Sequence, residues 1–565
     1  MYVDGKILIA KSDENEIYIN PKMANRHGLI AGATGTGKTV TLKVMAESFS
    51  DMGVPVFLAD AKGDLAGTIM PGEENENVSS RVSSMGLAEK GYSFKSYPVT
   101  FWDVLSQGGI PLRTTVSEMG PTLLSRIMEL NDTQTDIMNI VFKIADDEGL
   151  LLIDTKDLRS MLRYVSENAA EYSLKYGNLA KQSIAAITRA LVSLETEGGE
   201  SFFGEPALSI GDLMKVSPDG RGMIHILDSR QLMMSPKLYA TFMLWLISEL
   251  FEGLPEEGDL AKPKMVFFFD EAHMLFDDAP KSLVSKVEQM VKLIRSKGVG
   301  IYFVTQNPTD IPDGVLAQLG NKVQHALRAY TPAEQKNLKA AAQGFRENPA
   351  FKTLDELSNL GTGEALISVL DEQGIPTIVE KCKVLPPQSY MGAISDAQRS
   401  EFITSSLYSV KYNEMFDRDS AYEFLERRDI QLSEEAERAA QEALEAKERE
   451  KAEKEAEKER ERAEKEAERE RQKYIREQER AQEKAEREAQ RAAEKAEKER
   501  QREAEKKSRE TNNAINSVGR SVSGTVGREI GNTLGKTVGG SFGKRLGGNL
   551  GSSLGRGLFN TFLKK

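Results

Sequence analysis

The stretch Gly32-Ala33-Thr34-Gly35-Thr36-Gly37-Lys38-Thr39 decides the fold of this chain. It matches the pattern G-x-x-x-x-G-K-[ST] and lies between an apolar run, Gly28–Ala31, and a run with helical spacing, Val40–Phe49. Strand, glycine loop and helix in this order predict a phosphate-binding loop, because backbone N–H groups and the helix dipole then face the phosphates. Lys38 is expected to reach the β- and γ-phosphates, and the Thr39 hydroxyl to bind Mg²⁺. The residues expected to contact the nucleotide are Gly32, Ala33, Thr34, Gly35, Thr36, Gly37, Lys38, Thr39 and Val40.

Further short apolar runs alternate with helical patterns along the chain. These runs are Val54–Ala59, Met223–Leu227, Met265–Phe269 and Gly300–Val304. The alternation predicts an α/β fold in which helices cover both faces of a parallel sheet. Thr122–Leu194 has mostly helical periodicity, which predicts a helical subdomain inserted into this core. Ala365–Val369 and Thr377–Val384 are predicted to form a hairpin that closes the core.

Composition divides the chain into successive parts. The predicted parts are residues 1–72, the first part of the core; 73–209, a mainly helical insertion; 210–410, the second part of the core; 411–432, a linker; 433–510, a charged helical arm; and 511–565, a basic glycine-rich tail. The arm consists almost entirely of Glu, Lys, Arg, Ala and Gln. This composition favours a solvated single helix held by ion pairs between residues i and i+4. A coiled coil is the alternative, but it needs apolar a and d positions, which here are nearly all alanine.

The tail has a four-residue repeat in which an apolar residue is usually followed by glycine, as in Val526-Gly527 and Leu546-Gly547. Such glycines permit close approach between helices but cost helix stability in water, at about 1 kcal/mol each. The tail is therefore expected to be ordered only against a partner or a lipid surface. Its eight basic residues and one acid give it a positive charge, which suits an anionic membrane or protein contact.

The net charge of the whole chain is −12. The first 432 residues carry −16, residues 433–510 carry −3, and the basic tail carries +7. This acidic core gives no overall electrostatic footprint for nucleic acid, although the sum does not exclude a basic pore lining. One cysteine excludes a disulfide framework, and no apolar run is long enough to span a membrane. The chain opens on polar residues without a signal peptide, so a cytoplasmic location is expected.

Two carboxylates end the buried run Met265–Phe269. Asp270 is expected in the Mg²⁺ shell, and Glu271 is placed to polarise an attacking water, which favours hydrolysis of the nucleotide over binding alone. The alternative is that the two acids cap the next helix. His273, two residues further on, is expected to pack at the start of that helix.

Several polar residues at other strand ends are further candidates. Gln306 follows the run Tyr302–Thr305 and is expected to contact the γ-phosphate or the water, or else to satisfy loop backbone groups. Asp64 ends a segment expected beside the phosphate loop, where it assists Mg²⁺ or simply forms a turn. Arg328 and, second, Arg295 are candidates for an arginine that stabilises transition-state charge from a neighbouring subunit; a surface position is the alternative for each.

Together the phosphate loop, the helical insertion, Phe268–Glu271 and Val304–Pro308 resemble the HerA/FtsK superfamily of P-loop ATPases. His27–Gly32, Asp60–Asp64, Arg113–Glu118 and the tail look like its YjgR-like (helicase HerA-like) bacterial ATPases. The resemblance implies a RecA-like (ASCE) core that binds ATP and Mg²⁺, assembles into hexameric rings and takes an arginine in trans. Few residues precede the phosphate-loop strand, so the N-terminal β-barrel of HerA itself is not expected.

Two functions remain open on these grounds. The first is a ring-forming helicase or translocase that couples ATP hydrolysis to movement of double-stranded DNA or another macromolecule. The second is a nucleotide-driven switch or scaffold without nucleic acid, which docks through residues 511–565 to a membrane, to a protein or to its own copies. A small-molecule kinase is disfavoured, because Glu271 beside Asp270 favours water as the nucleophile.

Overall fold

The computed structural model describes residues 1–258, 260–277 and 281–482, and these divide into two compact units. The first unit comprises Met1–Arg159 and Gln182–Ser420, and the second comprises Ser160–Lys181 and the chain from Ala421 onward. The glycine-rich tail and the arm beyond Gln482, including residues 483–510, lie outside the described residues.

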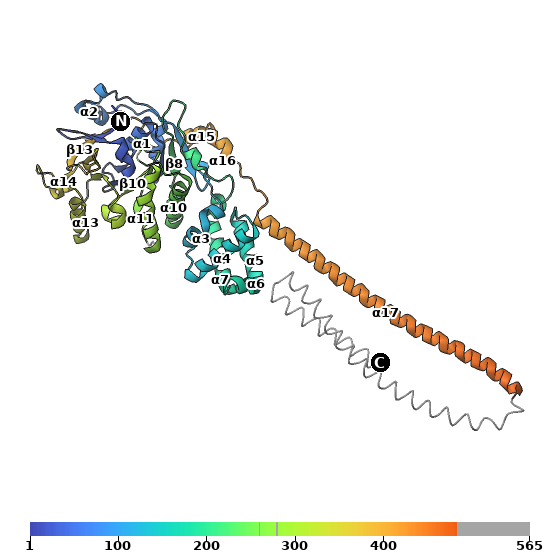
Figure 1. Cartoon of the computed structure of the whole chain (residues 1–565). Coiled ribbons are helices and arrows are strands. Elements are labelled where there is room, and N and C mark those ends of the chain that lie inside the picture. Colours follow the sequence, from blue (N-terminus) through green and yellow to red (C-terminus); the bar gives the residue numbers. More distant parts are fainter. Residues whose placement is uncertain (259, 278–280, 483–565) are drawn as a thin grey trace. The chain divides into compact units, whose positions relative to one another are not determined.

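A 13-stranded mixed sheet forms the centre of the first unit (Figure 1). From one edge to the other its strands are β1 (Tyr2–Val3), β2 (Lys6–Lys11), β13 (Glu380–Val384), β12 (Glu364–Ser368), β11 (Asn321–His325), β4 (Gly28–Ala31), β10 (Val299–Thr305), β9 (Met265–Phe269), β5 (Val56–Asp60), β8 (Ile224–Asp228), β6 (Val99–Asp103) and β7 (Ile110–Pro111), with β3 (Glu16–Ile19) paired to β2. The strands from β11 to β7 are parallel, whereas β12, β13, β2 and β1 continue the sheet in antiparallel fashion.

The described residues of the two units also form helices. They are α1 (Lys38–Asp51), α2 (Glu76–Met85), α3 (Val116–Ile127), α4 (Asp132–Glu148), α5 (Thr155–Glu167), α6 (Ala169–Tyr176), α7 (Lys181–Leu194), α8 (Glu200–Phe202), α9 (Ile210–Leu213), α10 (Pro236–Gly253), α11 (Lys281–Ile294), α12 (Asp313–Leu316), α13 (Pro332–Gln343), α14 (Thr353–Asn359), α15 (Asp396–Thr404), α16 (Leu407–Tyr412) and α17 (Ala421–Gln482). Short 3₁₀ turns include η6 (Ala272–Leu275), η7 (Arg295–Lys297) and η8 (Pro308–Asp310).

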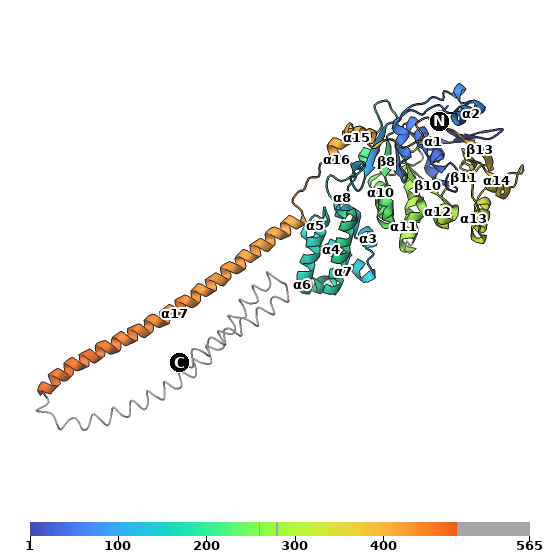
Figure 2. The same cartoon turned by 180° about the vertical axis from the view of Figure 1, so that it is seen from behind.

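The direction of each crossover decides which face of the sheet its helix covers. Helix α1 connects β4 to β5 and moves the chain across the sheet in one direction. Helix α10 connects β8 to β9, and α11 connects β9 to β10; both move the chain in the opposite direction. Because such crossovers are right-handed, α1 covers one face and α10 and α11 the other. Figures 1 and 2 show α10 and α11 side by side. Both faces are thus buried, as the apolar strand runs predict.

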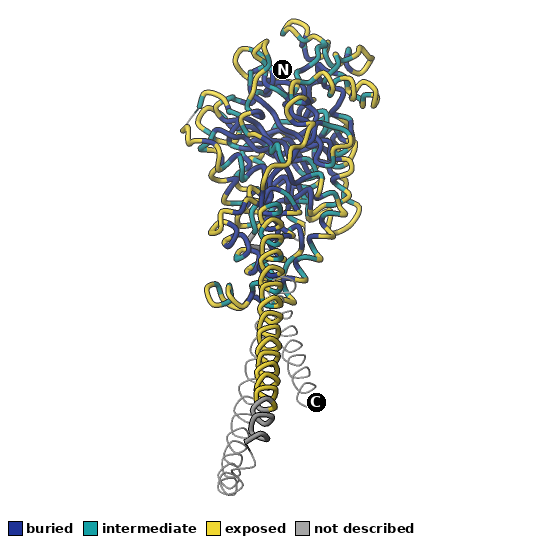
Figure 3. Tube along the Cα trace, turned by 90° about the vertical axis from the view of Figure 1, so that its right-hand side faces the viewer, coloured by how far each residue is buried: buried dark blue, intermediate teal, exposed yellow. Residues whose placement is uncertain are grey.

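The central strands and α1 share one hydrophobic core. The ring of Phe49, on α1, lies 6.4 Å from that of Phe268 on β9 and 5.9 Å from that of Tyr302 on β10, measured between centroids. All three side chains are almost fully buried, and Figure 3 shows buried residues through the interior of the first unit. This packing fixes the helix that leaves the phosphate loop against the strands that carry Asp270 and Gln306.

The parallel strand order confirms the α/β prediction and specifies it. Strand β10 lies between β4, which leads into the phosphate loop, and β9, which ends at Asp270. A strand inserted between the phosphate-loop strand and the strand that ends in the carboxylates is the feature of the RecA-like arrangement, which the resemblance led us to expect. The hairpin prediction is also confirmed, since β12 and β13 pair antiparallel.

Two predicted boundaries differ from the structure. The helical insertion does not begin at residue 73, because β6 pairs with β8 and extends the sheet, and β7 pairs with β6; the mainly helical segment begins at α3. The region 411–432 is not only a linker, because α17 already begins at Ala421. The residues from Ala421 to Leu432 contain no glycine or proline, so nothing in their sequence interrupts the helix.

The second unit contains the long charged helix. Within this unit Arg163 forms an ion pair with Asp429 (2.9 Å), and the Arg428 guanidinium lies 4.7 Å from the centre of the Tyr164 ring. From Leu444 to Arg471 the side chains of α17 are exposed (Figure 3), and Glu450 pairs with Lys454 four residues later. The helical arm is confirmed as far as Gln482. None of the described helices is both long and apolar enough to cross a membrane.

Candidate nucleotide-binding site

The phosphate loop occupies residues 32–37, between the end of β4 and the start of α1. Gly35 at its tip has φ 76°, and a Cβ there would meet no atom within 4 Å. Gly37 has φ 118°, and a Cβ there would lie 3.2 Å from the Cα of Gly363. Both positions require glycine, since side-chain-bearing residues rarely adopt these conformations. The loop is therefore open at its tip and closely backed at its base.

Backbone hydrogen bonds fix the loop from the neighbouring strands. The N–H of Ala33 donates to the carbonyl of Ala326 (2.8 Å), and the N–H of Gly32 donates to that of Thr305 (3.3 Å). The helix α1 has no side-chain cap at its N-cap residue, Gly37. The first N–H groups of any helix have no intrahelical partner, and here no N-cap side chain binds them either, so they can bind an anion.

The Lys38 ammonium lies inside the loop. Its Nζ donates to the carbonyls of Gly32 (2.6 Å) and Ala33 (3.2 Å). Burial lowers the pKa of Lys38, while the carboxylates of Glu271 and Asp270 act in the opposite direction. The lysine is thus near the place where phosphate oxygens are expected, and it is within electrostatic reach of both acids.

Asp270 and Glu271 follow β9 at the carboxyl edge of the parallel strands. Burial and the charge of Glu271 raise the pKa of Asp270 to about 7, whereas the Glu271 N–H, Lys62 and Lys38 oppose that rise. Glu271 adopts a left-handed conformation (φ 48°), and its N–H donates to Oδ1 of Asp270 (3.0 Å). Such a conformation costs a non-glycine residue about 1–3 kcal/mol and is found preferentially at functional sites.

Gln306 lies beside Glu271, as expected from their places on adjacent strands. Its Nε2 is 3.5 Å from Oε2 of Glu271. Since β10 lies between β4 and β9, the Gln306 amide follows the strand that separates the phosphate loop from the two carboxylates.

Two oxygen-bearing side chains suit a magnesium ion. The hydroxyl of Thr39, in the first turn of α1, and the carboxylate of Asp270 are hard oxygen ligands of the kind that Mg²⁺ takes.

The expectation that Asp60–Asp64 ends a strand beside the phosphate loop is wrong. Strand β5 pairs with β8 and β9, so β9 and β10 separate it from β4. Asp60 instead shapes its own turn, because its Oδ1 accepts the N–H of Gly63 (2.7 Å). Strand β5 follows β4 in the sequence, which suggested that the two are neighbours. The chain instead passes over the positions of β10 and β9 before it enters the sheet again as β5.

The arginine candidates lie at opposite ends of the parallel strands. Arg328 follows β11 and donates to the carbonyls of Ser358 (2.6 Å) and Leu360 (3.1 Å). Arg295 lies in η7, directly before β10, and so at the opposite end of the parallel strands from the phosphate loop. Both side chains are exposed.

Sequence reasoning missed several residues that surround the site. The Tyr239 hydroxyl donates to the backbone carbonyl of Asp270 (2.7 Å). Nδ1 of His273, expected to be a packing residue, lies 3.6 Å from Oε2 of Glu271. His325 lies under the loop, where its Nε2 accepts from the Thr41 hydroxyl (2.8 Å) and its Nδ1 donates to the Glu364 carbonyl (2.9 Å). Only His273 carries a sequence signal, its proximity to Glu271; the others come from distant segments.

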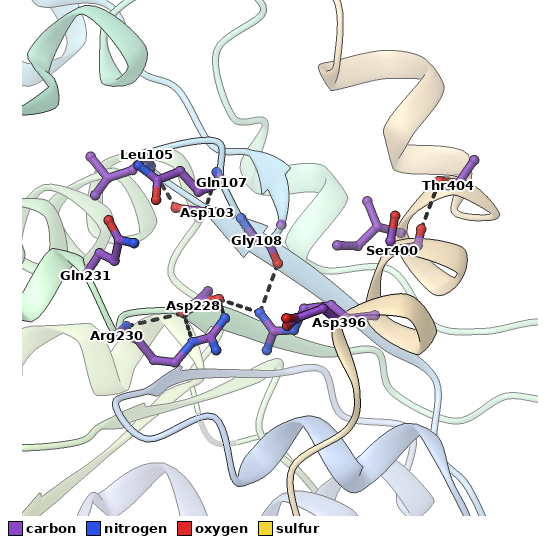
Figure 4. A pocket seen from close by; sticks show the side chains of 13 residues that line it. Asp103, Leu105, Gln107, Gly108, Asp228, Arg230, Gln231, Asp396, Ser400 and Thr404 are labelled. Atoms are coloured by element: carbon purple, nitrogen blue, oxygen red, sulfur yellow. Dashed lines mark hydrogen bonds and ion pairs between the residues drawn. The ribbon is translucent and has the colours of Figure 1, made fainter.

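A second cavity, of about 620 Å³, lies at the carboxyl ends of β6 and β8 (Figure 4). Its charges are largely paired with one another: Asp228 accepts from Arg230 (2.6 Å) and from Arg399. The Asp103 carboxylate accepts backbone N–H groups, including that of Gly108 (2.6 Å). None of the phosphate-loop residues lines this cavity, so it is separate from the nucleotide site.

The fold and the site together define a P-loop ATPase with an additional strand between its phosphate-binding and carboxylate-bearing strands. The family described as helicase HerA-like C-terminal matches residues 6–484, and the chain belongs to that family. This result confirms the resemblance on which the RecA-like prediction rests.

Individual relatives are distant. The DNA double-strand break repair helicase HerA of Sulfolobus acidocaldarius is 22% identical over 66% of this chain and 68% of its own length. A probable helicase of Methanocaldococcus jannaschii is 30% identical over 21% of this chain and 22% of its own length. Among solved structures, VirB4 of Thermoanaerobacter pseudethanolicus aligns with 68% of this chain and 97% of its own, at 16% identity and TM-score 0.44. The plasmid coupling protein TrwB in complex with the ATP analogue ADPNP aligns with 66% and 88%, at 15% identity and TM-score 0.43.

The raised pKa of Asp270 makes Mg²⁺-dependent binding of ADP sensitive to pH. Below pH 7 the carboxyl is protonated, and it must lose that proton to bind the metal, so affinity falls as the pH falls. We expect the Mg²⁺-dependent affinity for ADP to be about tenfold weaker at pH 6 than at pH 8, measured by isothermal titration calorimetry. Titrations with a chelator in place of Mg²⁺ correct for protonation of the nucleotide. Equal affinities at the two pH values after this correction would contradict the assignment of Asp270.

Proposed function

We propose that this protein hydrolyses ATP with Mg²⁺ between the subunits of a hexameric ring and uses the energy to move double-stranded DNA. The observation that carries the hydrolytic part is that Glu271 and Gln306 lie next to each other at the ends of β9 and β10. Strand β10 is in turn the neighbour of β4, which leads into the phosphate loop. A carboxylate and an amide at this edge suit the activation and orientation of a water molecule. The motor part of the proposal is supported by analogy with the relative named as a DNA double-strand break repair helicase.

Each residue has a separate part in this proposal. The backbone of residues 32–37 and the Lys38 ammonium bind the phosphates, while Thr39 and Asp270 hold Mg²⁺. The bound ion would neutralise charge on the phosphate oxygens. Glu271 accepts the proton of the attacking water, and the Gln306 amide orients that water or reports the presence of the γ-phosphate.

Substitutions at Lys38 and Glu271 separate binding from hydrolysis. Glu271→Gln keeps the size of the side chain but removes the base, so we expect nucleotide affinity to change little and kcat to fall by about 10²–10⁴-fold. Lys38→Ala is expected to lose both binding and turnover. Steady-state ATPase assays and ADP titrations measure these effects, with the exposed Glu347→Gln as a matched control. Normal turnover in Glu271→Gln would remove Glu271 as the base.

A mixing experiment identifies an arginine that acts in trans. If Arg328 of one subunit serves the phosphate loop of the next, Lys38→Ala and Arg328→Ala subunits are inactive alone but complement each other in mixed rings. At equal mixing we expect about a quarter of wild-type turnover, because a quarter of head-to-tail junctions then join an intact loop to an intact arginine. Arg295→Ala is mixed in the same way. Activity that never exceeds that of the separate variants would exclude the arginine tested.

DNA coupling is tested by ATPase activity across a titration of duplex DNA. We expect turnover to rise severalfold, and this stimulation to fade between about 50 and 200 mM salt, because phosphate contacts release counterions. Glu271→Gln in the same titration controls for contaminating ATPases. A response that is flat at both salt concentrations, with activity still lost in Lys38→Ala, would reject DNA as the substrate.

A flat response of that kind favours the second candidate, a nucleotide-driven switch or scaffold. The observation behind it is the sequence of residues 511–565, which combines basic residues with a repeated apolar position. This composition suits docking to an anionic membrane or to another copy of the tail.

A further inference from the structure

A turn from the hairpin region contacts the phosphate loop from outside the sheet. The chain leaves β11 at Ala326, whose carbonyl binds the loop, and returns through α13 and α14 to the turn Gly361–Glu364. There the N–H of Gly363 donates to the carbonyl of Thr36 (2.9 Å). Residues 326–363, which we call the excursion, are thus attached to the phosphate loop at both ends.

The bond to Thr36 determines how the loop presents its donors. In a trans peptide unit the C=O and the N–H point in opposite directions. When Gly363 holds the carbonyl of Thr36, the N–H of Gly37 in the same peptide unit must point away from the turn. Loss of the Gly363 contact leaves this peptide plane free to rotate, and the loop then loses a fixed donor for a phosphate oxygen.

Arg81, on α2, holds the turn in this position. Its Nη1 donates to the carbonyls of Gly363 (2.9 Å) and Val384 (2.7 Å), and its Nη2 donates to that of Thr362 (3.2 Å). A Cβ at Gly363, which has φ 74°, would lie 2.6 Å from Nη2. The turn is therefore built around the guanidinium, and glycine at position 363 makes room for it.

The helix that carries Arg81 is itself anchored near the loop. Val82 and Met85 of α2 pack in one small hydrophobic cluster with Val40 and Val44 of α1 and with Leu385, directly after β13. Burial lowers the pKa of Arg81, and the charge of Glu364 opposes this effect. Hydrogen bonds from a charged, partly buried donor are stronger than neutral ones, so the two bonds to Thr362 and Gly363 fix the turn firmly, and the third ties it to the end of β13 at Val384.

We propose that Arg81 is a positioning residue for nucleotide binding, which acts through the Thr362–Gly363 turn on the Thr36–Gly37 peptide of the phosphate loop. This inference rests on the proposed nucleotide-binding function. It does not require hydrolysis or DNA, because Arg81 acts on the geometry of the phosphate loop and its hydrogen bonds go to the carbonyls of Thr362, Gly363 and Val384.

The test compares nucleotide affinity with turnover in the full chain. For Arg81→Ala we expect the Kd for ADP with Mg²⁺ and the KM for ATP to rise about tenfold, while kcat at saturating ATP stays within about twofold. Arg81→Lys, which keeps the charge but not the fork of donors, is expected to have an intermediate Kd. Gly363→Ala displaces the guanidinium and should raise the Kd as Arg81→Ala does, and the double variant should be no worse than either single one.

Controls separate positioning from general damage and from failure of the function itself. Arg346→Ala is the matched control, because its guanidinium also donates to a hairpin carbonyl, that of Pro376 (3.5 Å), outside the phosphate loop. Thermal unfolding without nucleotide shows whether each variant folds. If Arg81→Ala does not fold, the Kd of Arg81→Lys for ADP with Mg²⁺ tests the inference instead. A folded Arg81 variant with wild-type Kd would overturn the inference. A wild type that binds ADP but does not hydrolyse ATP would refute the proposed hydrolysis and leave this inference standing.

Discussion

The hydrogen bond from the Ala33 N–H to the carbonyl of Ala326 is the interaction on which the site depends. It joins the first turn of the phosphate loop to the end of β11, while β10 on the other side binds Gly32 through Thr305. Because Ala33 N–H and the Gly32 carbonyl belong to one peptide unit, this bond also turns that carbonyl toward the Lys38 ammonium. The parallel alignment of three strands thereby sets the direction of the groups that face the phosphates.

The same alignment brings the acidic half of the site into place. Strand β10 is shared: it pairs with β4 on one side and with β9 on the other. Gln306 follows this shared strand and therefore stands between the phosphate loop and Glu271. Burial of the Asp270 carboxyl, together with the charge of Glu271, explains why its pKa is raised to about 7. Substitutions that shift β10 are consequently expected to disturb both halves together.

Sequence reasoning predicted the site residues that follow directly from a strand. The phosphate loop, Asp270 and Glu271, and Gln306 each come right after an apolar run, and the structure places them after β4, β9 and β10, which are neighbours in the sheet. Their roles stay predictions. Sequence reasoning failed where the spatial order of strands matters: Asp64 was expected beside the loop, and the insertion was expected to begin at residue 73, although β6 and β7 belong to the sheet. Arg81 and His325 act through backbone carbonyls and a hydroxyl of segments distant in sequence, and no local pattern reveals such contacts.

The excursion 326–363 has a consequence for how this fold can change. Its two ends meet the phosphate loop at Ala326 and Gly363, while its apolar residues, such as Leu338 and Leu357, form a cluster with Leu366 of β12 that is distinct from the main core. A segment with anchored ends and a hydrophobic cluster apart from the main core can change its exposed surface while the two anchoring peptides remain the same. New binding surfaces can thus arise within a few residues of the phosphate loop without any alteration of the loop itself.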